Sequence, residues 1–156
     1  MGNNGSSSGA PAFGLELRAG VESNLYPWRD MIDYVFQSSK DASEKRLLSR
    51  EAQLQILEAI DPLVKDLTEG TNVEICDKLG IEGSFQPPTD WCVALLDQIP
   101  SLGQARYDIV PRFIEEESFW CRYVNQIFFL IQDEMRIKHG VTFEDDETIN
   151  IPTALE

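Results

Sequence analysis

The segment from Ile114 to Lys138 constrains the fold of this chain most strongly, because it contains neither proline nor glycine and its apolar residues recur at helical spacing. Two apolar stripes run side by side along it. They comprise Phe119 and Tyr123 on one stripe, and Trp120, Val124, Ile127, Ile131 and Met135 on the other. Adjacent stripes predict a helix that is buried over most of its circumference. The continuous apolar run in this segment, Ile127 to Ile131, is too short to span a bilayer. We therefore expect this helix to form the centre of a helical domain.

Five shorter segments also show helical periodicity. They are Trp28–Gln37, Leu47–Leu67, Val73–Leu79, Trp91–Gln98 and Ser101–Asp108. In the second segment one apolar face is expected to run from Leu47 to Leu67, and Pro62 is expected to kink or split the helix after Ile60. Thr89 or Asp90 is expected to cap the helix that follows. Strand signals are few, so the sequence predicts an all-α fold, a small helical bundle with a long apolar C-terminal helix.

Composition divides the chain into three parts. Residues 1–20 open with Gly, Asn and Ser and offer little to bury, which predicts a flexible N-terminal segment. Residues 21–138 are expected to form one helical domain, as the chain length of 156 residues favours. Residues 139–156 contain five acidic residues and neither Lys nor Arg, so we expect an acidic tail.

The first residues, MGNNGS, fit a myristoylation signal in which Gly2 becomes the N-terminus after Met removal. They also fit a plain flexible tail or linker, and both interpretations stay open. A single myristoyl chain binds a membrane only weakly. Membrane association is therefore expected only if Gly2 is lipidated.

Charge limits the classes of partner. Thirteen Lys and Arg residues against twenty-seven Asp and Glu give a net charge of −14. Nucleic-acid binding depends on clustered basic residues, so we expect no autonomous binding to nucleic acid. Proteins with basic patches are the expected partners. The three cysteines lack metal-site or disulfide spacing and favour a reducing compartment, with the cytoplasm first and the nucleus or an organelle as alternatives.

No residue pattern indicates catalysis. Nucleophilic catalysis needs a nucleophile beside a base, and the single histidine, His139, falls at the end of the long helix, where it fits a helix-terminal role. Phosphate loops and calcium loops are not recognisable. We therefore expect a protein that is not an enzyme and has no cofactor, catalytic residue or metal site.

A continuous motif spans the two C-terminal helical segments. It reads Ala105-Arg106-Tyr107-Asp108-Ile109-Val110-Pro111-Arg112, then Glu115, Glu116, Phe119, Trp120, Arg122 and Tyr123, preceded by an upstream Ala94 to Leu102 stretch. This motif resembles the BSD domain of transcription-factor and synapse-associated proteins, over about residues 89–137. Val124 is a departure, since many members carry an aromatic residue there.

The resemblance implies a small helical bundle that docks to other proteins. Its signature residues here are Tyr107, Val110, Pro111, Phe119, Trp120 and Tyr123. We interpret them as mainly structural, with Phe119 and Trp120 in the core. The implied function is a non-enzymatic protein–protein interaction adaptor. The alternative is a structural subunit of a larger assembly, such as a transcription or repair complex or an organellar complex.

Overall fold

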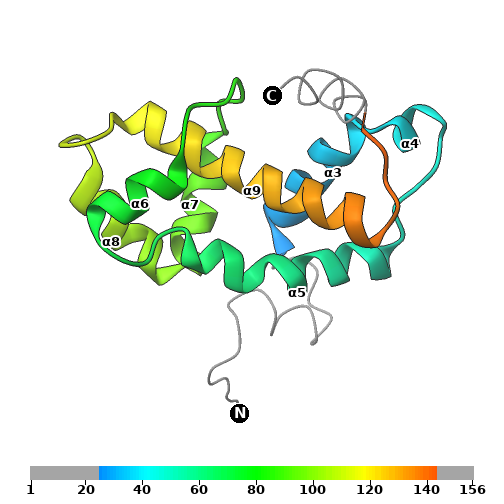
Figure 1. The fold of residues 1–156 in the computed structure, drawn as a ribbon, viewed down its shortest axis with the longest axis horizontal. Coiled ribbons are helices and arrows are strands. Elements are labelled where there is room, and N and C mark those ends of the chain that lie inside the picture. The colour runs from blue at the N-terminus through cyan, green and yellow to red at the C-terminus, as the bar shows by residue number, and fades with distance from the viewer. Residues whose placement is uncertain (1–24, 144–156) are drawn as a thin grey trace, which may run out of the picture.

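The computed structural model describes residues 25–143, and in this range every regular element is a helix. The helices are α3 (Trp28–Gln37), α4 (Lys40–Ser43), α5 (Arg50–Asp66), α6 (Asn72–Leu79), α7 (Thr89–Gln98), α8 (Pro100–Ile109) and α9 (Glu116–Lys138), as Figure 1 shows. The predicted all-α bundle is confirmed. The expected flexible segment at residues 1–20, Gly2, and residues 144–156 of the acidic tail lie outside the described residues.

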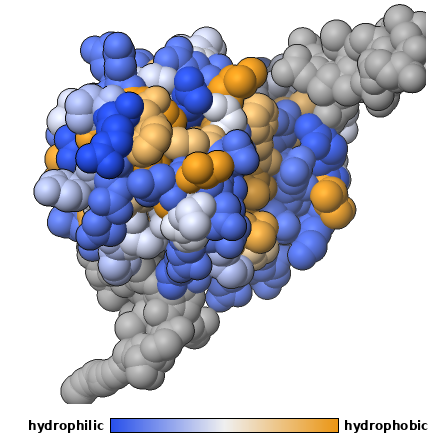
Figure 2. Space-filling model, turned by 60° about the vertical axis from the view of Figure 1, so that its left-hand side comes forward, coloured by the Kyte–Doolittle hydropathy of each residue, from blue (hydrophilic) through white to orange (hydrophobic). Residues whose placement is uncertain are grey.

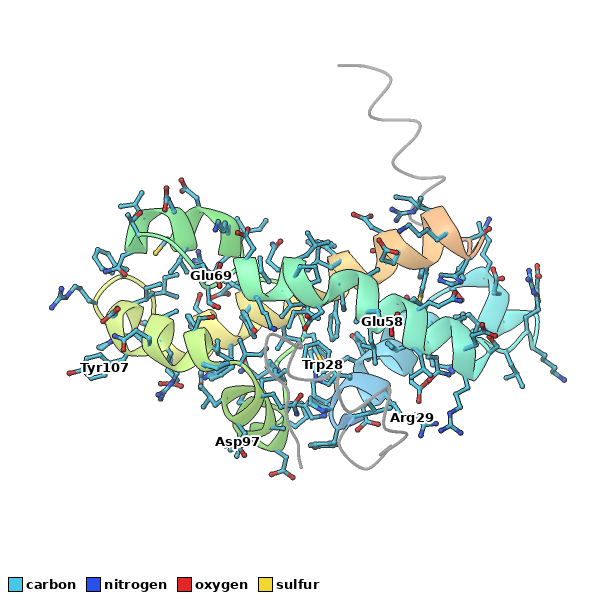
Figure 3. All side chains as sticks on the ribbon, turned by 90° about the horizontal axis from the view of Figure 1, so that it is seen from below. Trp28, Arg29, Glu58, Glu69, Asp97 and Tyr107 are labelled. Carbon is cyan, nitrogen blue, oxygen red and sulfur yellow. The ribbon has the colours of Figure 1, made fainter. Side chains whose placement is uncertain are left out.

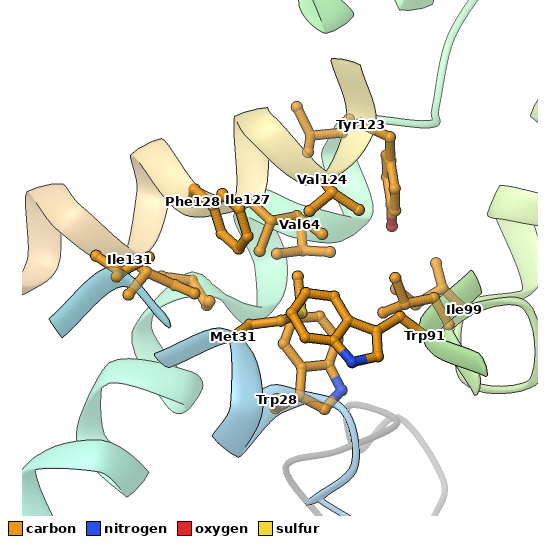
Figure 4. Packing of buried hydrophobic residues seen from close by; sticks show 14 of the residues in the cluster. Trp28, Met31, Val64, Trp91, Ile99, Tyr123, Val124, Ile127, Phe128 and Ile131 are labelled. Carbon is orange, nitrogen blue, oxygen red and sulfur yellow. The ribbon is translucent and has the colours of Figure 1, made fainter. Parts of the chain in front are cut away.

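Helix α9 crosses the length of the domain and packs against α3, α5 and α6 (Figure 1). Tyr123, Val124 and Ile127 on α9 are fully buried. In Figure 4 Val124 and Ile127 lie beside Val64, on the side that faces Met31 and Trp28, and Tyr123 points toward Ile99. These four neighbours are equally buried. Burying one such side chain stabilises the fold by roughly 1.5–3 kcal/mol. The predicted central helix is therefore confirmed, although it begins at Glu116 and Phe129 on its middle turn is half-exposed.

The side-chain amide of Gln98 connects helix α3 to the C-terminal half of the domain. Trp28 Nε1 donates a hydrogen bond of 2.7 Å to Gln98 Oε1, and Gln98 Nε2 donates one of 2.7 Å to the Tyr26 carbonyl. Because the Trp28 ring is fully buried, its polar N–H needs such a partner. The contact joins α3 to the last turn of α7.

The structure contradicts the expected start of α5 at Leu47 and its expected split after Ile60. The helix begins at Arg50 behind Ser49, whose Oγ accepts from the Ala52 N–H (3.0 Å), and Leu47 is 92% exposed, outside the helix. Pro62 neither splits nor ends the helix. The proline is exposed on the solvent face, while the buried Ile60 and Val64 hold both sides of it in the helix.

The domain continues past the expected boundary at residue 138. Val141 and Phe143 are buried, although both were expected in the acidic tail. The Lys40 N–H donates to the Thr142 carbonyl (2.7 Å), and the Thr142 N–H donates to Asp41 Oδ1 (3.1 Å). Residues 141–143, here called the C-terminal strap, therefore pack on α4, a short helix that the sequence did not predict.

Helix α7, at the other end of the domain, starts without the expected side-chain cap. α7 begins behind Pro88, and neither Thr89 nor Asp90 caps it. α8 packs against both α6 and α7. It ends before Val110, which is extended as expected for a residue before proline. In the described part of the chain, no helix is both long and apolar enough to cross a membrane.

Candidate functional site

An ion pair joins α8 to the first turn of α9. Arg106 donates to both carboxylate oxygens of Glu116, through Nε (2.8 Å) and a terminal nitrogen (2.7 Å), in a bidentate arrangement. One turn later, Trp120 Nε1 donates to Glu116 Oε2 at 2.7 Å. The hydrogen bonds from Arg106 hold the pKa of Glu116 below its usual value of 4.5, and the Trp120 donor acts in the same direction. These hydrogen bonds connect α8 to the first two turns of α9.

A hollow of about 550 Å³ lies on one side of this ion pair. We call it the α7–α9 hollow, because Val93 and Leu96 of α7 line it together with Trp120 and Glu117 of α9. Pro87, from the connection before α7, adds a further apolar wall. The hollow therefore combines aliphatic and aromatic surface with carboxylates.

A second hollow, of about 390 Å³, lies against the same ion pair and is lined by Tyr107, Val110, Pro111 and Glu115. A third, of about 250 Å³, shares Tyr107, Val110 and Pro111 with the second. We call the three together the corner surface. The end of the molecule that carries α8 comes forward in Figure 2, where hydrophobic residues lie among hydrophilic ones.

The structure divides the six signature residues into two groups. Phe119, Trp120 and Tyr123 are buried in the core, where their rings pack against one another at centroid distances between 5.3 and 6.3 Å. Val110 is half-buried and Pro111 is exposed. Tyr107 is 80% exposed and projects outward from the end of the molecule (Figure 3). The buried group holds the fold, whereas Tyr107 and Pro111 line the corner surface.

Residues 80–88, which connect α6 to α7, form one wall of the α7–α9 hollow and are hydrogen-bonded to α9. Cys121 Sγ donates to Gln86 Oε1 at 2.9 Å, and Arg122 donates to the Gly80 carbonyl at 2.7 Å. Phe85 also packs between the rings of Tyr34, Trp91 and Phe128. This wall of the hollow is therefore held in place by the fold itself.

The thiol in the α7–α9 hollow is suppressed as a nucleophile. Burial, with help from the nearby Glu116 carboxylate, raises the pKa of Cys92 to about 11. A thiol with this pKa is protonated near neutral pH, and the thiolate is the reactive form. Among the described residues no group of three or more His, Cys, Asp or Glu side chains is placed to hold a metal ion.

Sequence reasoning missed the centre of this site. Arg106 and Glu116 belong to the quoted motif, but they were not identified as a pair, and neither Val93 nor Glu117 was a candidate. Opposite charges on the two sides of the Val110-Pro111 turn were the available signal. This signal identifies the pair only when the angle between α8 and α9 is known, because the two residues lie on separate helices.

Comparison with known families agrees with the motif. Residues 90–136 match the family model of the BSD domain, close to the range of about 89–137 expected from the sequence. The chain therefore contains a BSD domain, formed by α7, α8 and nearly all of α9. No curated protein and no solved structure matches the chain.

Proposed function

We propose that this BSD-domain protein is a non-enzymatic adaptor that binds another protein through the corner surface. One observation carries the proposal: the exposure of Tyr107 beside two hollows, within a motif whose other aromatic residues are buried. Core packing accounts for Phe119, Trp120 and Tyr123 but not for a tyrosine that is 80% exposed. Exposed aromatic residues beside preformed hollows are typical anchors of protein interfaces.

Charge supports a basic protein as the partner. Residues 25–143 carry twelve Lys and Arg against twenty Asp and Glu, a net charge of −8. Such a surface attracts basic patches and repels phosphate backbones, so the proposal excludes autonomous nucleic-acid binding. The adaptor would act in the cytoplasm, and at a membrane only if Gly2 is lipidated.

Affinity capture from native cells tests this function. The bait is the full chain, compared with Tyr107→Ser and with Ile81→Ser, a control at a residue of nearly equal exposure (79%) that does not line the corner surface. We expect at least one protein captured in near-stoichiometric amount to fall fivefold or more with Tyr107→Ser and to persist with Ile81→Ser. Capture that is indifferent to Tyr107, with both variants folded by circular dichroism, would contradict the proposal.

The salt dependence of that complex provides a second check. Exposed charges are screened beyond about 8 Å at physiological ionic strength, so the association rate should fall as salt rises, while the dissociation rate changes less. Surface plasmon resonance on the purified pair measures both rates. An association rate independent of salt would remove the charge argument.

A further inference from the structure

We infer that the α7–α9 hollow binds a short segment of the partner protein in which aliphatic side chains stand next to lysine or arginine. This inference rests on the proposed function and specifies the chemistry of the partner at one part of the corner surface. The apolar walls select the aliphatic side chains, and an uncompensated carboxylate selects the cation.

Apolar side chains in the hollow are left partly exposed to solvent. Val93 is 54% exposed and Leu96 is half-buried, and both line the hollow beside Trp120. The volume of about 550 Å³ lies within the range of roughly 300–1,000 Å³ that is usual for binding sites. It accommodates an aliphatic side chain together with neighbouring backbone. Because the fold already holds the walls, little ordering cost is expected on binding.

Glu117 provides a negative charge in the hollow. Its side chain lines the hollow, and it forms no ion pair with any described residue. Arg106 is the one cation among the described residues that lines the hollow, and its guanidinium is already engaged by Glu116. Glu115, next to Glu116 on the other side, also forms no ion pair within the described range.

The balance of charge favours a cation even at a helix N-terminus. Helix α9 begins at Glu116, and its N-terminal end contributes roughly +0.5 of an elementary charge. Among the residues that line the hollow, Arg106 adds one positive charge, and Glu116 and Glu117 bring two negative ones. The remaining charge is about −0.5, because two carboxylates exceed the guanidinium and the dipole combined. A lysine or arginine is therefore attracted, and an acidic segment is repelled.

Nuclear magnetic resonance on the full chain labelled with ¹⁵N tests the inference. The chain has three tryptophans, and each gives one indole N–H signal. Trp120 lines the hollow, whereas Trp28 is fully buried and bonded to Gln98, so the Trp28 signal serves as an internal control. The three signals are assigned with conservative Trp→Phe variants.

Three acetylated and amidated synthetic peptides serve as probes. The first is Ser-Gly-Leu-Leu-Lys-Arg-Gly-Ser, the second replaces Lys-Arg by Glu-Glu, and the third replaces Leu-Leu by Ser-Ser. We expect the first peptide to shift the Trp120 signal saturably while the Trp28 signal stays in place. The second and third should bind at least tenfold more weakly, because each lacks one of the two selected features.

Matched variants locate the binding on the hollow. Val93→Ser is compared with Val73→Ser, the same change at another exposed helical valine. Glu117→Gln is compared with Asp97→Asn, which removes one charge from an exposed residue of α7 that does not line the hollow. We expect Val93→Ser and Glu117→Gln each to weaken binding of the first peptide at least fivefold, and both controls to stay within twofold. All four positions are exposed, so the variants should fold.

The outcomes separate this inference from the proposed function. Equal binding of the Leu-Leu-Lys-Arg and Leu-Leu-Glu-Glu peptides would overturn the cation selection while leaving the hollow as a docking surface. Absence of any Trp120 shift with all three peptides would overturn the inference entirely. In either case the capture experiment with Tyr107→Ser judges the adaptor function independently, because Tyr107 does not line the α7–α9 hollow.

Discussion

At the scale of single residues, Trp120 serves both the core and the candidate site. Its ring is 5% exposed and packs edge to face on Phe119 and Tyr123, at centroid distances of 5.3 and 6.1 Å. Its N–H donates to Glu116, and its remaining surface lines the α7–α9 hollow. The sequence predicted the buried part from helical periodicity, but periodicity cannot indicate that the indole also forms the wall of a hollow.

Replacement of Trp120 should therefore be costly. We expect Trp120→Ala to lower the free energy of unfolding by about 3–5 kcal/mol, the usual cost of truncating a buried large aromatic residue. Trp120→Phe keeps most of the ring packing and loses the hydrogen bond to Glu116, so it should cost less. Urea denaturation followed by circular dichroism measures both. An unchanged midpoint for Trp120→Ala would mean that the residue is not part of the core.

Tyr123 should tolerate the loss of its hydroxyl. The side chain is fully buried, its Oη has no hydrogen-bond partner among the described residues, and burial raises the pKa of the phenol. An unsatisfied buried polar group costs about 1–3 kcal/mol, so Tyr123→Phe should leave stability unchanged or raise it by about 1 kcal/mol. Thermal unfolding measures the change. A clear loss of stability would reveal that the hydroxyl has a partner.

Asp61 should make the domain less stable at neutral pH than in mild acid. Burial raises the pKa of Asp61 above 3.8, outweighing the opposing effect of Lys65 at 3.6 Å, and Oδ1 has no partner among the described residues. The folded state therefore holds this proton more tightly, and the contribution of Asp61 to stability declines as pH rises from 3.8 through its folded pKa.

The substitution Asp61→Asn removes this dependence. The variant should gain stability relative to the wild type as pH rises through that window, reaching about 1 kcal/mol or less at pH 7, because a neutral amide costs less to bury than a carboxylate. Denaturation at several pH values measures the difference. A variant that loses stability relative to the wild type between pH 4 and pH 7 would mean that the Lys65 pair dominates.

At the scale of helices, regular apolar spacing was sufficient to predict the position of a helix that buries a continuous face. α3 was predicted with its observed ends, and α9 with an error of two residues at its start. Spacing failed where tertiary packing decides. Leu47 fits the α5 stripe by number yet precedes the Ser49 cap, and Pro62 is tolerated because it faces solvent. α4 is too short for any periodicity to predict it.

The C-terminal strap gives a prediction at this scale. Phe143 is 2% exposed and Arg136 lies over its ring at 5.8 Å, while Asp41 binds both the Thr142 N–H and Arg46. Phe143→Ala should therefore cost about 3–5 kcal/mol. The control is Ile137→Ala, an apolar truncation at a residue that is 72% exposed. Equal midpoints for the two variants in urea would show that the strap adds no stability.

At the scale of the whole molecule, the folding unit is larger than the part that matches the BSD domain. α9 belongs to the matched residues 90–136, but the faces of α9 that pack on α3 and α5 are covered from outside that range. Both the matched range and the all-α class were predicted from the sequence. The pairing of α9 with α3 and α5 was not, because no local pattern specifies which helices meet.

A fragment of residues 89–138 should consequently fail to fold as it does in the full domain. Trp28 of α3 and Leu57 of α5 contribute fully buried side chains to the shared core, and removing both helices would expose α9 residues such as Ile127 and Ile131. A chain of this size also buries too little surface to be robust alone, since domains below about 60 residues are marginal. Residues 25–143 should show a cooperative thermal transition by circular dichroism, whereas the fragment should show reduced helicity and none. A cooperative transition in the fragment would mean that α7, α8 and α9 fold independently of α3 and α5.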